Sequence, residues 1–252
     1  MANLRTAIAF HIQAYSNVAA SPVTCIDDAN VVAGTDVLVI RRTNTTLPIG
    51  PLVANEVYMQ ANADSTNAAN PVIALGSQAA NFTLVRKDAV TPGLFIPAEI
   101  RKYHVIIYFV SPCSEPVGGA VCTAAADGGR PIPTLKRLRL AFDGTALTML
   151  TESVAEGIEN LQVDYGVDAD GDGLPDGAFV AAPASVAAWS DVMGVQVFVL
   201  ARTPERTTGI VDNKTYNLGT FGAVVAPGDL YRRHLFTSQV RLVNPASRRE
   251  AP

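Results

Sequence analysis

The chain has 252 residues, of which 48% are hydrophobic and 17% charged, and it contains 19 Gly and 16 Pro. This balance is typical of a folded globular protein with many turns and excludes disorder of the whole chain. The formal net charge is −4 and the basic residues are scattered, so nucleic acid is not an expected partner.

The first sixteen residues predict an amphipathic helix. Leu4, Ile8, Ile12 and Tyr15 recur at steps of three and four, which is the spacing of one helix face. Polar residues interrupt this stretch, so it is too polar to cross a membrane by itself. We expect the helix to lie on the body of the protein.

Runs of β-branched and aromatic residues, separated by Gly and Pro, predict strands along the rest of the chain. These runs lie at 34–42, 56–60, 81–87, 101–110, 134–142, 158–167, 193–202 and 234–243. The dipeptide Asp143-Gly144 predicts a hairpin turn into a further strand at 146–152, and a short helical turn is expected at 153–157.

One helix followed by strands indicates an α+β fold dominated by β structure. We expect an N-terminal helix packed on a mostly antiparallel sheet with long loops. The expected organisation is a single domain over 1–252, with the helix at 1–16 and a β-rich body at 17–252.

Three cysteines are present. Cys113 and Cys122 bracket a segment rich in Pro, Gly and Ser, and their short separation predicts a disulfide that closes a loop. Such a bond favours an oxidising compartment, although two reduced thiols would have the same sequence. Cys25 is left without a partner.

The segment DADGDGLPD at 168–176 resembles the first nine positions of an EF-hand calcium loop. Neighbouring carboxylates repel one another without a cation, so the segment predicts a weak Ca²⁺ site. The candidate ligands are Asp168, Asp170, Asp172, Leu174 and Asp176. The twelfth loop position is Phe179 where a complete EF-hand has Glu, so Asp164 or backbone carbonyls would have to contribute. The alternative is a solvated acidic turn between two strands.

No motif indicates an enzyme. The chain has no G-x-S-x-G elbow, phosphate-binding loop, dinucleotide turn or C-x-x-C pair. His11, His104 and His234 lie in separate elements without metal-ligand spacing, which favours ordinary structural roles. We therefore expect no catalytic residues and no organic cofactor.

Two features could bind another protein. The first is a basic cluster, which consists of Arg232, Arg233 and His234 with Arg248 and Arg249 near the end. Charges at such positions are more often simply solvated. The second is an open sheet edge, where a neighbouring subunit could add its own strand.

Several segments together resemble the PilW family of type IV pilus minor pilins. They are GTDVLVIRR at 34–42, RKYHVIIYFVSP at 101–112, IPTLKRLRL at 132–140, VAEGIENLQVDYGVDADGDGLPD at 154–176, Trp189 with DVMGVQVFVLAR at 191–202, and YRRHLFTSQVRLVNP at 231–245. The resemblance spans nearly the whole chain.

The resemblance implies a structural subunit of the pilus, in a complex that primes assembly or forms the tip. It implies other minor pilins and an adhesin-like tip protein as partners. It also implies a location at the periplasmic face of the inner membrane and in the extracellular pilus. Family members begin with a long apolar helix, so we expect residues 3–16 to be the remaining half of that helix. The alternative function is a secreted Ca²⁺-dependent binding module or adhesin.

Overall fold

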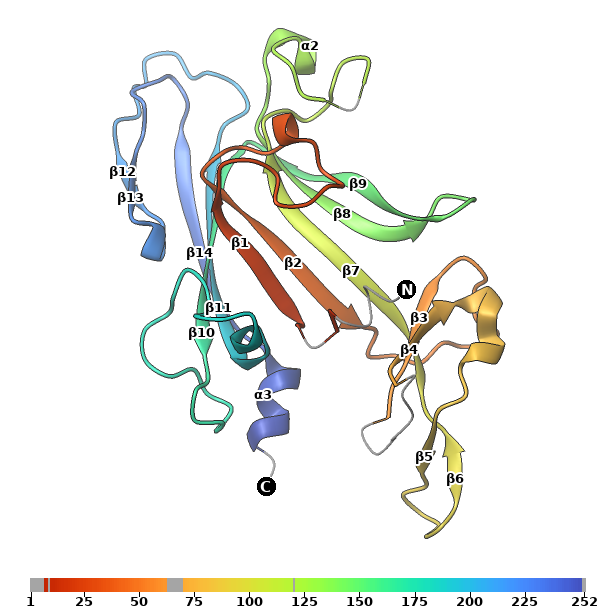
Figure 1. Ribbon diagram of the computed structural model, residues 1–252. Coiled ribbons are helices and arrows are strands. Elements are labelled where there is room, and N and C mark those ends of the chain that lie inside the picture. Colours follow the sequence, from red (N-terminus) through yellow and green to blue (C-terminus); the bar gives the residue numbers. More distant parts are fainter. Residues whose placement is uncertain (1–6, 9, 63–69, 120, 251–252) are drawn as a thin grey trace. The chain divides into compact units, whose positions relative to one another are not determined.

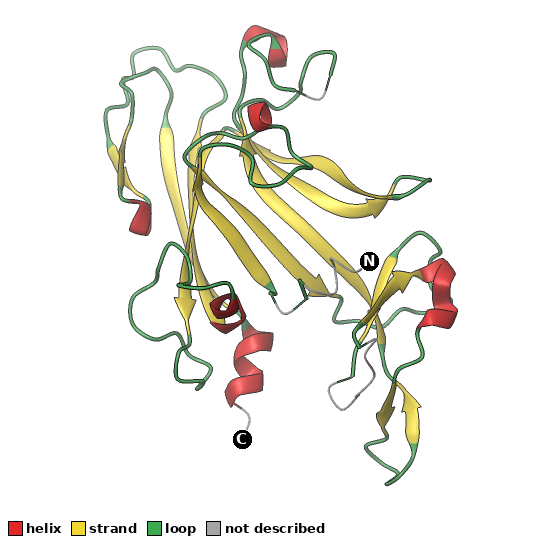
Figure 2. Ribbon diagram, in the orientation of Figure 1, coloured by secondary structure: helices red, strands yellow, loops and turns green. Residues whose placement is uncertain are grey.

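The computed structural model of the chain describes residues 7–8, 10–62, 70–119 and 121–250. The chain divides into two compact units. Figure 1 labels their helices and strands. Unit 1 comprises Met1–His11, Ile40–Ile106 and Arg139–Leu150, and unit 2 comprises Ile12–Val39, Ile107–Leu138 and Thr151–Pro252. Strands dominate both units (Figure 2), and the expectation of a single domain stays a prediction.

Unit 1 is organised around the short strand β3 (Val57–Gln60). It pairs antiparallel with β4 (Val72–Leu75) on one side and with the beginning of β7 (Ile100–Ser111) on the other. The buried Gln60 amide donates to the carbonyls of Leu84 and Ala98 at 3.0 and 2.8 Å. These bonds fix both ends of the hairpin formed by β5 (Val85–Lys87) and β6 (Phe95–Pro97). The 3₁₀ helix η2 (Gly76–Asn81) completes the unit.

Unit 2 contains most of the strand structure. In its first sheet, β1 (Ile12–Val18) lies beside β2 (Thr35–Thr43), and β2 lies beside β7. The sheet continues from β7 to β8 (Thr134–Phe142) and β9 (Leu147–Glu156). Strands β2, β7, β8 and β9 each contribute residues to both units.

The second sheet of unit 2 is antiparallel, with the order β10 (Ile158–Val167), β11 (Val192–Arg202) and β14 (Arg233–Arg241). A separate hairpin of β12 (Thr215–Asn217) and β13 (Ala223–Val225) covers one face of this sheet. The turn η4 (Gly219–Phe221) joins the two hairpin strands. Between hairpin and sheet lies a small core of Phe198, Leu200 and Leu218.

The main core of unit 2 draws on both sheets. Its most deeply buried apolar side chains are Val37, Phe109, Val110, Leu138, Val163, Tyr165, Val192 and Met193. Trp189, in the 3₁₀ helix η3 (Ala187–Asp191), packs edge-on against Tyr165 with ring centroids 4.8 Å apart. The remaining helical elements are η1 (Asp28–Asn30), α2 (Ala126–Gly129) and α3 (Val243–Glu250). None of the helices in the described residues is long and apolar enough to span a bilayer.

The expected N-terminal helix packed on a sheet is wrong. Residues 12–18 form strand β1, and residues 1–6 and 9 of the predicted helix lie outside the described part. The β1 backbone is fixed at both ends, because Arg41 N–H donates to His11 and Gly34 N–H donates to Val18. Ile12 and Ala14 are buried on alternate positions. The apolar residues of this segment fit the spacing of a helix as well as that of a strand, and pairing with β2 makes the segment a strand. The fold is therefore dominated by β structure.

Most predicted strands are confirmed within one or two residues, including the hairpin at Asp143-Gly144. The helical turn expected at 153–157 is wrong, because β9 continues to Glu156. Gly157 then turns the chain with φ +78°, and a Cβ there would lie 2.3 Å from the Arg202 carbonyl oxygen. Strands β1, β4, β6, β12 and β13 were not predicted.

Asp36 connects the two sheets of unit 2. Its carboxylate is only 1% exposed. One oxygen accepts from the Asn17 N–H on β1 at 2.7 Å, and the other accepts from the Val163 N–H on β10 at 2.8 Å. Nearby, the Gln162 amide donates to the Gly34 carbonyl at 2.7 Å. The outer edge of β10 is thus joined by side-chain bonds to the start of β2.

Burial raises the pKa of Asp36 to about 6, and repulsion from Asp164 adds to the effect. The two backbone N–H groups oppose this shift. Because the folded-state pKa is raised, the contribution of Asp36 to stability is fully present below about pH 4 and is lost as the pH rises through about 6.

We predict that Asp36→Asn destabilises the protein more at pH 5 than at pH 7.5. Asparagine offers one acceptor for two N–H groups, which costs about 1–3 kcal/mol. At pH 7.5 the buried Asp36 of the wild type is charged, which lowers the stability of the wild type but not that of the variant. The difference in unfolding free energy between wild type and variant is therefore smaller at pH 7.5 than at pH 5, by about 1 kcal/mol. Denaturant unfolding at both pH values measures this difference.

Asp143→Asn serves as the control for this pH series. Asp143 lies in an exposed turn and accepts from the N–H groups of Thr145 and Ala146, which lower its pKa. Its effect on stability should be the same at pH 5 and 7.5. A constant or widening difference for Asp36→Asn would contradict the assigned role of Asp36.

Candidate functional site

The acidic loop follows β10 directly, and its two ends are fixed by backbone hydrogen bonds. Asp168 N–H donates to the Asp191 carbonyl at 2.8 Å, and Asp176 N–H donates to the Val167 carbonyl at 2.7 Å. Beyond the loop, Tyr165 and Val180 exchange both backbone hydrogen bonds. The acidic loop therefore leaves the end of β10 and returns to its edge, with both ends held by backbone hydrogen bonds.

Three of the predicted ligands come together in this loop. Asp168, Asp170 and Asp176 each offer a carboxylate oxygen, and these oxygens lie within 4.8 Å of one another. Oxygens that bind one Ca²⁺ at 2.3–2.6 Å can be separated by this distance. Asp172 lies outside the group, and Leu174 is half exposed. The chemistry of the three carboxylates fits a hard cation.

Backbone amides already compensate much of the negative charge in the loop. Asp168 accepts from the N–H groups of Gly171 and Gly173 at 2.7 and 3.0 Å. Asp176 accepts from Ala169 and Asp170 at 2.6 and 3.2 Å. The close approach of Asp168 and Asp176 thus has a structural explanation in the loop backbone.

The two residues considered beyond the loop template have other roles. Asp164 accepts from the backbone N–H and the hydroxyl of Thr220 in η4, which ties β10 to the β12–β13 hairpin. Phe179 packs over the paired glycines Gly166 and Gly194, where an added Cβ would lie 3.1 and 3.5 Å from its ring. An aromatic residue at the twelfth loop position is therefore explained by packing.

The structure joins Cys113 and Cys122 by a disulfide, which is the predicted pair. The Cys122 N–H donates to the Asn30 side chain at 2.8 Å, so the bond also anchors the loop to η1. Cys25 is a free, exposed thiol. The disulfide therefore orders the surface around the end of β7.

The predicted basic cluster is not a free cationic patch. The Arg233 guanidinium is only 3% exposed and forms ion pairs with Glu159 on β10 and with Asp229. Arg202 binds Glu159 as well, and its guanidinium lies 4.1 Å from the centre of the Tyr231 ring. These contacts give Arg233 and Arg202 a structural role. The side chains of Arg248 and Arg249 lie outside the described part.

Strand β14 is an edge strand with an exposed apolar face. In the described sheet it pairs only with β11. Phe236 and Val240 lie opposite Val199 and Val195, so they share the face that is buried on β10. Their side chains are nevertheless 56% and 47% exposed. His234 extends this face and packs edge-on against Phe236, with ring centroids 4.5 Å apart.

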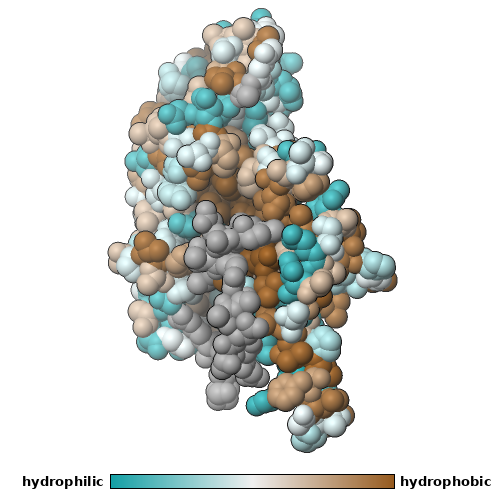
Figure 3. Space-filling model, turned by 45° about the vertical axis from the view of Figure 1, so that its right-hand side comes forward, coloured by the Kyte–Doolittle hydropathy of each residue, from teal (hydrophilic) through white to brown (hydrophobic). Residues whose placement is uncertain are grey.

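Hydrophobic side chains also lie on the surface of unit 1. The hairpin β5–β6 exposes Val85, Val90, Leu94 and Phe95. Part of the surface of this hairpin is brown at the bottom of the view in Figure 3. The loop at 47–53 exposes Leu47, Ile49 and Val53. Exposed apolar groups of this kind commonly mark protein interaction surfaces.

The comparison with protein families gives one match. The family model described as type IV pilus-assembly protein W matches residues 120–244. This segment contains the acidic loop and all three strands of the β10–β11–β14 sheet. No curated protein and no solved structure matches the chain.

We predict that replacing both Cys113 and Cys122 with Ala lowers the free energy of unfolding by about 2–3 kcal/mol, because the unfolded chain loses a covalent loop. Denaturant unfolding without reductant measures the loss, and Cys25→Ala is the control that should change little. Reductant should destabilise the wild type by a similar amount and leave the double variant unchanged. Equal stability of wild type and double variant without reductant would contradict a structural role for the bond.

Proposed function

We propose that this chain is a PilW-type protein that acts as a minor pilin, because residues 120–244 match the family model of type IV pilus-assembly protein W. In this role it is a structural subunit, without catalytic activity, that contacts other minor pilins and an adhesin-like tip protein. Its place would be the periplasmic face of the inner membrane and the extracellular pilus. The observation that carries this proposal is the exposed apolar face of β14 within the matched segment.

Two properties of β14 support docking of another subunit. Its outer edge carries backbone N–H and C=O groups that can continue a sheet into a neighbour. Its exposed Phe236 and Val240 can be buried in the same contact, at about 25 cal/mol for each Å² removed from water. Isolated subunits usually protect such an edge, so an assembled partner is a simple explanation for its exposure.

We also propose that the acidic loop binds Ca²⁺ weakly through Asp168, Asp170 and Asp176. The ion would replace solvent among carboxylates that already face one another. The hydrogen bonds within the loop already bring these carboxylates together, so little rearrangement would be needed for binding. The bound ion would further rigidify the loop beside β10. No reaction step is assigned to the ion.

We predict that replacing Phe236 and Val240 with Ser impairs pilus assembly without unfolding the chain. Loss of two apolar anchors should weaken a subunit contact by about 3 kcal/mol, which is about a hundredfold in affinity. In cells that lack the gene for this chain, the wild type should restore surface pili and the variant should not. Thermal unfolding of the purified variant checks that the fold is retained.

Val186→Ser is the matched control, because Val186 is 67% exposed in a loop of unit 2 outside the strands. This control should restore pili as the wild type does. Normal piliation by the β14 variant would rule out the β14 face as the docking surface. Normal piliation in cells without the gene would rule out the function itself.

We predict one weak Ca²⁺ site with a dissociation constant on the order of 10⁻⁴–10⁻³ M by calorimetric titration. Calcium at ten times that constant should stabilise the fold by about 1.4 kcal/mol. Asp170→Asn should abolish the heat of binding, whereas Asp172→Asn, outside the carboxylate group, should retain most of it. Absence of both binding heat and thermal shift at millimolar Ca²⁺ would favour the solvated acidic turn.

A further inference from the structure

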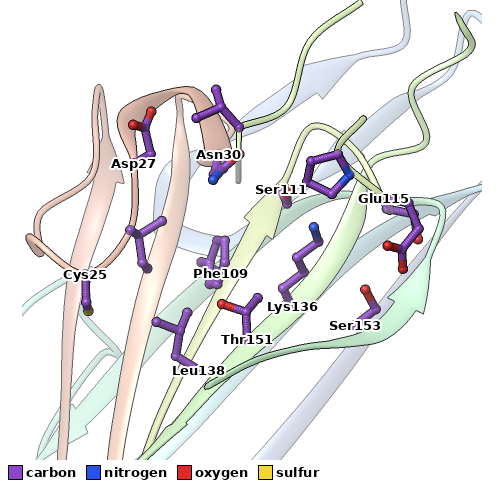
Figure 4. Close-up of a pocket in the computed structure, with 14 residues that line it drawn as sticks. Cys25, Asp27, Asn30, Phe109, Ser111, Glu115, Lys136, Leu138, Thr151 and Ser153 are labelled. Atoms are coloured by element: carbon purple, nitrogen blue, oxygen red, sulfur yellow. The ribbon is translucent and has the colours of Figure 1, made fainter. Parts of the chain in front are cut away.

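A cavity of about 480 Å³ lies in unit 2 beside the cysteine loop. Strands β7, β8 and β9 form its floor, and the segments around Cys25 and Glu115 form its rim (Figure 4). Its lining combines apolar side chains such as Phe109 and Leu138 with the hydroxyl groups of Ser111, Thr151 and Ser153. We call this cavity the Lys136 pocket, after its only lysine.

Lys136 occupies an inward position of β8. Side chains alternate along this strand, and Thr134 and Leu138 on the same face are 0% and 1% exposed. Lys136 itself is 6% exposed, which is unusual for a lysine. Figure 4 shows its ammonium group pointing into the cavity, near Ser111 and Glu115.

Among the described residues no hydrogen bond or ion pair holds the Lys136 ammonium, although the carboxylates of Glu115 and Asp127 both act on it electrostatically. Asp127 lies close enough to act on it electrostatically. However, the oxygens of Asp127 accept from the backbone N–H groups of Ser114, Glu115 and Ile132. The half-buried Asp127 carboxylate is therefore already used by the loop backbone, whereas Glu115, which has the larger electrostatic effect on Lys136, is exposed at the rim.

The Lys136 ammonium nitrogen keeps some contact with solvent, because it is not one of the fully buried polar atoms without a partner. Burying most of a charged side chain without a protein acceptor still costs folding free energy. Burial lowers the pKa of Lys136, and Glu115 and Asp127 only partly oppose this effect. A methionine would fill the same position without a charge. The lysine is thus poorly explained by stability and well explained by a ligand that supplies the missing acceptor.

We propose that the Lys136 pocket binds a carboxylate group. The ligand oxygen accepts from the Lys136 ammonium, and the hydroxyls of Ser111 and Ser153 lie in the same cavity as further donors. A singly charged anion fits better than a phosphate dianion, because the pocket has one lysine and also contains Glu115 and Asp27. The inference is independent of the proposed minor-pilin role.

The test uses sodium acetate as the probe and follows backbone amide signals of the full chain by NMR at constant ionic strength. Acetate should cause saturable shifts at Ser111 and Ser153, whereas its neutral counterpart acetamide should not. Lys136→Met should weaken acetate binding at least about tenfold, because a charge-assisted hydrogen bond is lost. Lys214→Met, which removes an exposed lysine of unit 2, should leave acetate binding unchanged.

Thermal unfolding gives a second and independent readout. Lys136→Met should raise the unfolding temperature, because it removes a buried charge without a partner. A lower unfolding temperature would mean that the ammonium has a structural acceptor, and this result would overturn the proposal. Lys136→Gln replaces the methionine variant in the acetate titration if the latter does not fold. If acetate causes the same NMR shifts in the Lys136 variant as in the wild type, the proposed carboxylate site is wrong.

Two peptides distinguish a free acid from a polypeptide as the source of the carboxylate. A short peptide that ends in a free carboxylate is compared with the same peptide amidated at that end. Stronger binding of the free-ended peptide than of acetate indicates a polypeptide ligand, and equal binding indicates a small acid. Equal binding of both peptides, without acetate binding, would overturn the proposal.

Discussion

The structure of unit 2 depends on a buried carboxylate that bonds to two strands from different sheets. Asp36 accepts one backbone N–H from β1 and one from β10, and no neighbouring cation neutralises it among the groups that shift its pKa. Its position at the start of β2 fixes where the β10–β11–β14 sheet begins. The acidic loop, the Trp189 contact and the open strand β14 all follow from the placement of β10. The residue that joins the two sheets is thus a buried carboxylate whose charged form is disfavoured in the folded protein.

The sequence predicted the long strands well because each is long enough to show its own period of burial. It failed where tertiary contacts decide between two periods. Ile12 and Tyr15 fit one face of a helix, but the pairing of residues 12–18 with β2 makes this segment a strand. Strands of three residues, such as β12 and β13, contain too few positions for any periodic signal. The disulfide was predictable because only two of the three cysteines lie close in sequence.

The candidate sites show a similar division. The spacing of Asp168, Asp170 and Asp176 was visible in the sequence, whereas the displacement of Asp172 depends on the loop backbone. Lys136 stands beside Arg137 and close to Arg139 on β8, so the sequence gives no sign that its side chain is buried. Only the alternation set by Thr134 and Leu138 reveals that it points inward. The role of Asp36 depends on strands that are more than 120 residues apart, as its bond to Val163 shows, and no local pattern could indicate it.

The ion pair between Arg233 and Glu159 has a mechanical consequence. Glu159 lies on β10 and Arg233 begins β14, so the pair crosses the middle strand β11. A force applied along β14 would act on all the backbone hydrogen bonds between β14 and β11 at the same time. The force would therefore be distributed over many bonds. The charged pair gives this force a second route into β10 and from there, through Asp36, into the first sheet. Pulling on β14 would therefore be resisted by both sheets of unit 2.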